Sequence, residues 1–149
     1  MKRFSFSLQS VADHRTVKRE AAERELVAAA SALSLAHAAL ERAIEARNTA
    51  LDSYTAFLES GKIDPEELSM HINHIALLVE RENESQARVN LLEREKENRR
   101  QGVIAASRDE KAISKLRDRH RDRHNSRAAR IEQIALDEMA TLSFVRRSK

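Results

Sequence analysis

The residues that break helices are confined to very few places in this chain, and this most constrains its fold. It has two glycines and one proline in 149 residues, and Gly61 and Pro65 fall within one short segment, Ser60-Gly-Lys-Ile-Asp-Pro65. Long stretches rich in Ala, Leu, Glu, Arg and Lys flank this segment, and these residues favour helices. The pattern predicts an all-α fold of two long helices joined by one tight turn.

The turn itself carries agreeing signals. Gly61 suits a left-handed cap at the end of the first helix. Asp64 is a good N-cap, Pro65 suits the first helical position, and Glu67 completes a capping box. We therefore expect a first helix over about 4–59, a turn over 60–64 and a second helix over about 65–143, all within a single coiled-coil domain, 1–149.

The apolar spacing predicts how the two helices pair. From Leu8 to Leu58 an apolar seam recurs about every 3.6 residues, which fits a weakly supercoiled pair. We expect an antiparallel two-helix coiled-coil hairpin, with the second helix longer than the first. Residue i should face about residue 124 − i, so that Leu8 lies near Leu116. Three polar seam positions are expected to weaken the pairing: Arg15, Lys18 and Arg47.

Composition argues against catalysis. Two isolated glycines cannot form a phosphate loop, there is no Cys nucleophile, and only 3% of the residues are aromatic. Ser and Asp are scattered along helical surfaces, without a cleft to desolvate them. His120 and His124 can share one helix face, but cations surround them and would oppose zinc. We expect no enzyme activity, no cofactor and no metal.

The chain also lacks features of secretion or membrane insertion. No apolar stretch typical of a secretory signal follows the first residues. We find no run of about 18 apolar residues, the length that a membrane span needs. A soluble cytoplasmic protein is the expectation.

Charge is unevenly distributed along the sequence. Residues 41–85 contain ten acidic and four basic residues, a net of −6, whereas residues 111–130 contain eight basic and two acidic residues, a net of +6. A basic helix beside a coiled coil is also found in nucleic-acid-binding proteins. That pattern fails after Arg130, where Glu132 and Gln133 follow, and Asp118 and Asp122 would face phosphates unfavourably. A basic nucleic-acid binder and a generic coiled-coil scaffold remain as alternatives.

Motifs at both ends are similar to those of a known family. The start reads Phe4-Ser-Phe-Ser-Leu8-Gln9, with Arg15 and Glu20 soon after, and the end reads Leu136-Asp-Glu-Met-Ala140 followed by Arg146-Arg147. With the two long helices and the turn near residue 61, these motifs make the chain resemble the flagellar export protein FliJ family over its whole length.

The resemblance implies a non-enzymatic component of a flagellar type III export apparatus. Such a protein is expected to be cytoplasmic and peripheral at the inner face of the cell membrane through its partners only. It is expected to act as a central-stalk-like adaptor. Its expected partners are the export ATPase hexamer, the cytoplasmic domain of the export gate and export chaperones, with no nucleic acid among them.

Two groups of residues are expected to make these contacts. For ATPase binding they are Phe4, Phe6, Leu8, Val11, Arg117, Arg119, Arg121, Arg123, Arg127 and Arg130, with further apolar contacts from residues 131–145. For export-gate binding, transferred from the family to the hairpin end, they are Leu51, Tyr54, Phe57, His71, His74 and Leu78.

Overall fold

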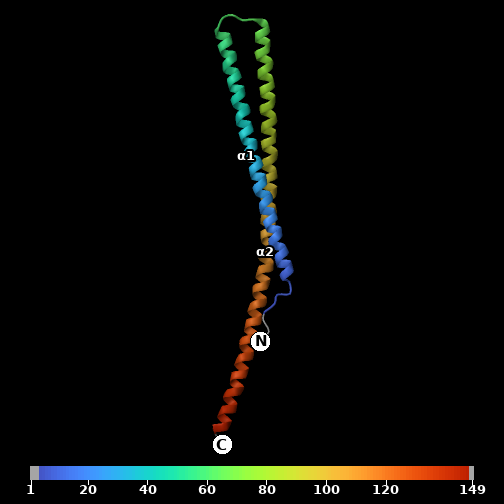
Figure 1. Ribbon diagram of the computed structural model, residues 1–149, viewed down its shortest axis with the longest axis vertical. Helices are drawn as coiled ribbons and strands as arrows, with labels where there is room; N and C mark the ends of the chain where they lie inside the picture. The colour runs from blue at the N-terminus through green and yellow to red at the C-terminus, as the bar shows by residue number, and fades with distance from the viewer. Residues whose placement is uncertain (1–3, 148–149) are drawn as a thin grey trace. The chain divides into compact units, whose positions relative to one another are not determined.

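Two helices make up the fold. A computed structural model describes residues 4–147, and the side chains of residues 4–144. Helix α1 spans Gln9–Glu59 and helix α2 spans Pro65–Arg147 (Figure 1). The predicted all-α hairpin, with the second helix longer than the first and packed against it, is confirmed. The side chains of Val145, Arg146 and Arg147 lie outside the described residues.

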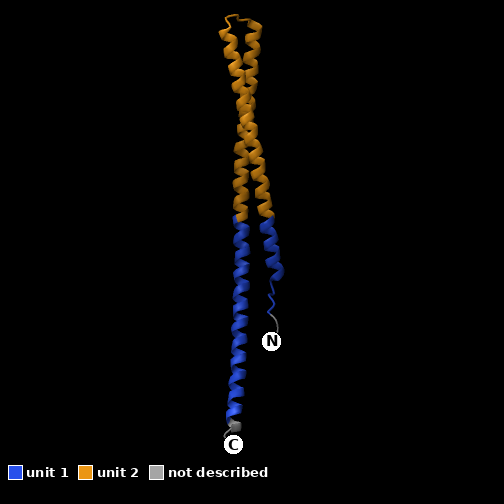
Figure 2. Ribbon diagram, turned by 60° about the vertical axis from the view of Figure 1, so that its left-hand side comes forward, with its two compact units in different colours: residues 1–20, 104–149 blue, residues 21–103 orange. Residues whose placement is uncertain are grey.

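Both outer helix ends differ from the expected bounds. Helix α1 begins at Gln9 rather than near Phe4, because residues 7 and 8 form a turn in which the Gln9 amide donates to the Phe6 carbonyl over 3.1 Å. Helix α2 continues past Ser143 to Arg147. The chain divides into two compact units: residues 1–20 with 104–149, and residues 21–103 (Figure 2). A single coiled-coil domain over 1–149 stays a prediction.

The unit of residues 21–103 is a hairpin with an alanine-rich seam. Its buried centre is formed by Leu33 and Ala36 of α1 with Val89 and Leu92 of α2, and Val89 is only 1% exposed. Small side chains let two helix backbones approach closely, so that one apolar seam excludes water without large residues. Arg47 of α1 also lies in this seam, where its guanidinium is 2.8 Å from Glu82 of α2.

The turn shows why the chain reverses here. Gly61 has φ of 70°, a left-handed conformation that glycine adopts without strain. Asp64 caps α2, since its Oδ1 accepts a hydrogen bond of 3.0 Å from the Glu66 amide. The expected reciprocal bond from the Glu67 side chain to Asp64 is not formed among the described residues, so only half of the capping box is present.

The other unit pairs the start of the chain with a middle portion of α2. Ala12 and Ala106 are buried in it, and Arg19 contacts Glu110 at 2.7 Å. Arg15 pairs with Asp109, and in the hairpin unit Glu25 pairs with Arg99 at 2.7 Å. The residue numbers in each of the last two pairs add up to the predicted 124. The expected register therefore holds within each unit.

Toward the ends of α1, the buried residues lie about one position away from those predicted for the seam. Leu8, Val11, Leu51 and Leu58 were expected in the seam but are 38%, 40%, 39% and 40% exposed. The alanines next to Val11 and Leu51, Ala12 and Ala50, are buried in their place. The prediction wrongly favoured the larger apolar residues at these positions. Where two helices approach closely, alanine fills the seam instead.

The expectation that no segment is apolar enough to span a membrane is also corrected. Part of α1 is long and apolar enough to cross a membrane by length and composition alone, contrary to that expectation. The reason is that Leu, Val, Ile and Ala together raise the mean hydropathy of this helix, although it has no uninterrupted apolar run of 18 residues. A helix near the N-terminus that passes this test is weak evidence for a span.

Candidate interaction surfaces

The first candidate surface, here called the basal surface, comprises residues 4–11 and α2 residues 117–130. Phe4 meets His124 edge-on with ring centroids 5.6 Å apart, and Phe6 meets His120 edge-on at 5.7 Å. Alternate residues of an extended chain point the same way and rise about 6.6 Å. Four helical residues rise about 6 Å, so the two spacings match. The Phe4/Phe6 pair thus docks on the His120/His124 pair.

This docking changes what the N-terminal residues offer to a partner. Phe6 is buried, at 7% exposure, and Phe4 is partly buried. Leu8 and Val11 remain exposed. Of the four apolar residues expected to bind a partner, the two phenylalanines are therefore already engaged with α2, and the other two are free to make contacts.

The arginines of the basal surface are mostly open to solvent. Arg117 is partly buried, and Arg121 lies 3.5 Å from Asp118, a pair that stays exposed. The remaining four form no ion pair or hydrogen bond within the part of the chain that the structure describes; they are the exposed Arg119, Arg123, Arg127 and Arg130. Their spacings of four, four and three residues place these four arginines on one side of the helix, which concentrates positive charge there. Arg123 and Arg127 also line a hollow of about 220 Å³ with His120 and His124.

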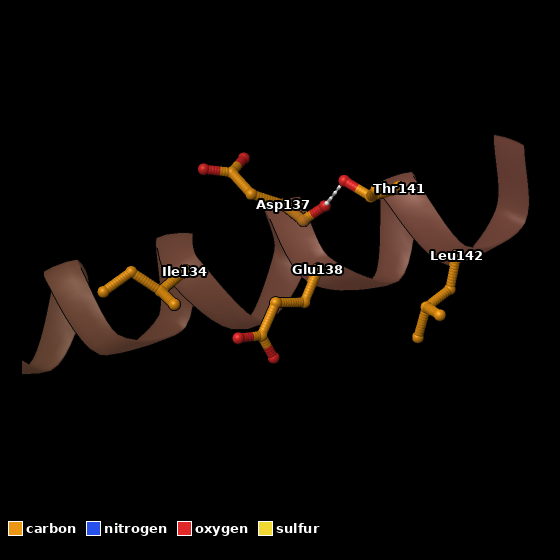
Figure 3. A pocket seen from close by; sticks show the side chains of 5 residues that line it. All are labelled: Ile134, Asp137, Glu138, Thr141 and Leu142. Carbon is orange, nitrogen blue, oxygen red and sulfur yellow. Dashed lines mark hydrogen bonds between the residues drawn. The ribbon is translucent and has the colours of Figure 1, made fainter. Parts of the chain in front are cut away.

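Beyond the basal surface, α2 presents an apolar stripe. We call this the C-terminal stripe, and its members are Ala128, Ile131, Ile134, Ala135, Met139 and Leu142. Each of the larger four is at least half exposed, from Ile134 at 52% to Leu142 at 63%. Ile131, Ala135 and Leu142 belong to the segment expected to add apolar contacts with the ATPase, and all three are exposed. Figure 3 shows Ile134, Glu138 and Leu142 along one side of the helix, and Asp137 and Thr141 on another.

The second candidate surface, the tip surface, lies near the turn in the hairpin unit. The His71 ring sits between Tyr54 and Phe57, with centroid distances of 5.9 and 5.1 Å. Leu51 and His74 are exposed, but Leu78 is only 6% exposed and lies in the seam. A groove of about 620 Å³ runs beside these rings and is lined by Arg42, Glu45, Ala46, Thr49, Ala50, Ser53, His71 and His74.

The structure therefore brings both predicted groups together but changes the roles of some members. Phe6 and Leu78 hold elements in place, whereas the exposed arginines, Leu8, Val11, Leu51 and His74 are accessible. The edge-on contacts of phenylalanine with histidine were not predicted from the sequence. The matched spacings of Phe4/Phe6 and His120/His124 were the signal that could have revealed them. Within the described residues, no group of three or more His, Cys, Asp or Glu side chains could hold a metal ion.

A two-helix fold whose candidate residues lie on charged and apolar surfaces is that of a coiled-coil interaction protein. A family model described as "Flagellar FliJ protein" matches residues 4–149, and the chain belongs to this family. Membership supports a role in flagellar biogenesis and type III protein export, as a cytoplasmic component associated with the export apparatus, in a family of structural and adaptor proteins. Comparison with curated proteins and with solved structures gave no match.

Proposed function

We propose that this protein is a non-enzymatic, central-stalk-like adaptor of the flagellar export apparatus. In this proposal the basal surface seats in the ring of the export ATPase, and the tip surface contacts the cytoplasmic domain of the export gate. The protein also escorts export chaperones, and it is held at the inner face of the cell membrane through its partners only. The observation that carries the proposal is the set of unpaired, exposed arginines on the basal surface.

Unpaired arginines favour binding to an acidic partner for two reasons. They attract it from a distance, which raises the association rate. They also lose no intramolecular ion pair on binding, because Arg119, Arg123, Arg127 and Arg130 have none among the described residues. Leu8 and Val11 add exposed apolar area within the same unit, where Val11 lines a hollow with Ile113 and Leu116. Docked Phe6 holds them there, so that a partner meets a preorganised surface.

The ATPase contact is tested by charge reversal. The variant Arg119→Glu/Arg123→Glu should reduce stimulation of the purified export ATPase by at least about tenfold, because two repulsive contacts replace two attractive ones. A matched control is Arg88→Glu/Arg94→Glu, two exposed arginines of α2 in the other unit. The control should stimulate normally. Equal stimulation by both variants would refute the basal docking, provided that circular dichroism shows unchanged helix content.

The tip surface offers a different chemistry. Tyr54 and Phe57 pack against the His71 ring, and aromatic residues are good interface anchors. Exposed Leu51 and His74 extend the surface along the groove. The acidic balance of residues 41–85 would select a basic or polar partner face.

Export-gate binding is tested with a leucine pair. Leu51→Asp should weaken binding of the purified cytoplasmic domain of the gate by roughly tenfold, since it places a charge among buried apolar contacts. Leu77→Asp is the control, because Leu77 is also an exposed leucine of the same unit, at 56% exposure, but outside the tip surface. If Leu51→Asp binds as well as Leu77→Asp in calorimetry, the tip assignment is wrong.

A further inference from the structure

The C-terminal stripe continues the face of α2 that the start of the chain covers. Ile113, Leu116, His120 and His124 follow one another at steps of three and four, and His120 and His124 meet Phe6 and Phe4. Ala128 is the next step of four, and Ile131 and Ala135 follow at three and four. The same helix face is thus covered by residues 4–11 and then left open, with Leu142 63% exposed.

Charge along the open segment is separated into two blocks. Arg123, Arg127 and Arg130 come first, at spacings of four and three that place like charges beside each other and destabilise a lone helix. Asp137 and Glu138 come later. The positions three and four residues from Arg127 and from Glu138 hold no residue of opposite charge. Within the described residues neither side chain forms an ion pair, so the helix alone leaves both charges uncompensated.

An identical helical segment running in the opposite direction would cover the open apolar stripe. It would also bring the acidic block of one copy beside the basic block of the other. We propose that the C-terminal stripe binds the same stripe of a second copy of this chain, as an antiparallel helix pair with twofold symmetry. The apolar stripe is then buried against itself. The basic block of each copy lies beside the acidic block of the other. Most of the stripe lies within residues 131–145, which were expected to add apolar contacts with the ATPase, so self-association and that contact would use the same surface. The self-association itself does not require the ATPase.

The geometry selects the antiparallel direction. Arg127 and Glu138 are eleven residues apart, or about three helical turns, so both lie on the same side of the helix, between the positions of Ile134 and Ile131. In a twofold antiparallel pair, equal edges of the two helices meet. Arg127 of each copy then faces Glu138 of the other, and Ile131 lies level with the other copy's Ile134. A parallel pair would instead bring Glu138 of the two copies to the same level within the contact, where like charges repel.

The contact is short and should be reversible. Two helical segments of about 20 residues bury on the order of 1,000 Å², at the lower limit for a specific interface. Glu138 interrupts the apolar stripe, so the pair depends on the compensating Arg127. We expect a monomer–dimer equilibrium with a dissociation constant in roughly the micromolar range.

Sedimentation velocity on the full chain from low to high micromolar concentration tests the proposal. The wild type should shift from monomer to dimer. Leu142→Asp should raise the dissociation constant at least about tenfold. Leu136→Asp is the control, because Leu136 is 58% exposed on the same helix but lies off the stripe, and it should dimerise normally. A wild type that stays monomeric throughout, or equal weakening by both variants, would overturn the proposal.

Charge reversal and cross-linking test direction. Arg127→Glu alone and Glu138→Arg alone should each weaken self-association at least about tenfold, and an equimolar mixture should restore it as a heterodimer. The natural chain has no cysteine, so an introduced cysteine is the only thiol in each copy and each disulfide identifies the two positions that meet. A mixture of Ala128→Cys and Met139→Cys should form the mixed disulfide in preference to either symmetric one. Predominantly symmetric disulfides would show a parallel pair and contradict the proposed geometry.

Discussion

The Phe6 ring lies edge-on against the His120 ring, at a right angle and with centroids 5.7 Å apart. This contact fixes the chain just before α1 begins, because the Phe6 carbonyl accepts the hydrogen bond of the Gln9 amide. Leu8 and Val11, which follow within a few residues, lie on the surface. An edge-on aromatic contact between a non-helical segment and a helix thus organises the basal surface.

Removal of this ring should release the start of the chain. Phe6→Ala should speed hydrogen exchange of the Gln9 amide by about tenfold or more, since its acceptor is then no longer held in place. Leu8→Ala serves as control, because Leu8 is 38% exposed and accounts for less packing. The two variants can be compared by NMR at the same pH. Unchanged exchange in Phe6→Ala would show that the ring does not fix this segment.

The seam of the hairpin unit should be sensitive at its most buried residue. Val89→Ala should lower the free energy of unfolding by roughly 2 kcal/mol, since it removes buried methyl groups and leaves a small cavity. Leu91→Ala, at an exposed position of the same helix, should change it by less than about 0.5 kcal/mol. Chemical denaturation monitored by circular dichroism measures both. Equal effects would argue against the packing of α1 on α2 around Val89.

The two glycines should respond in opposite directions. Gly61→Ala should cost roughly 1 kcal/mol, because an alanine at φ of 70° is strained. Gly102→Ala should stabilise the protein by up to about 1 kcal/mol, because the position is helical and an added Cβ meets no atom within 4 Å. Thermal unfolding of the two variants gives the signs. A destabilising Gly102→Ala would reveal a need for glycine that the surrounding atoms do not explain.

The ion pair of Arg47 and Glu82 should show coupling. The two side chains are 31% and 21% exposed and 2.8 Å apart, so water screens them only in part. A double-mutant cycle with alanine should give an interaction energy of about 1 kcal/mol that falls at high salt. The exposed pair of Arg100 and Glu97 offers a comparison within one helix and should couple less strongly. An interaction energy of zero between Arg47 and Glu82 would mean that Arg47 only weakens the seam, as first expected.

Sequence reasoning succeeded where local chemistry decides the structure. Gly61, Asp64 and Pro65 specify the turn through backbone conformation and capping, and these effects act over a few residues. The register followed as well, as Arg15 with Asp109 shows, because a single short turn leaves little freedom in how two helices align.

It was less successful where partners are distant in sequence. Arg47 was expected to weaken the seam, since its partner Glu82 cannot be assigned before the helices are aligned. Phe6 was assigned to an external partner for the same reason, because its contact with His120 joins segments more than a hundred residues apart. The buried residues at the ends of the seam were predicted wrongly. Whether Val11 or Ala12, and Leu51 or Ala50, is buried depends on the interhelical distance. That distance is a property of the folded pair and not of either helix alone.

The fold-back that brings the start of the chain onto α2 is most directly tested by a distance between spin labels at positions 8 and 116. The natural chain has no cysteine, and dilution with unlabelled protein removes distances between copies. Pairing of the two helices predicts a separation of roughly 10–20 Å, given an interaxial distance of 8–10 Å and the length of the labels. A separation approaching the ~160 Å of an uninterrupted helix over the same residues would contradict the fold-back and the basal surface built on it.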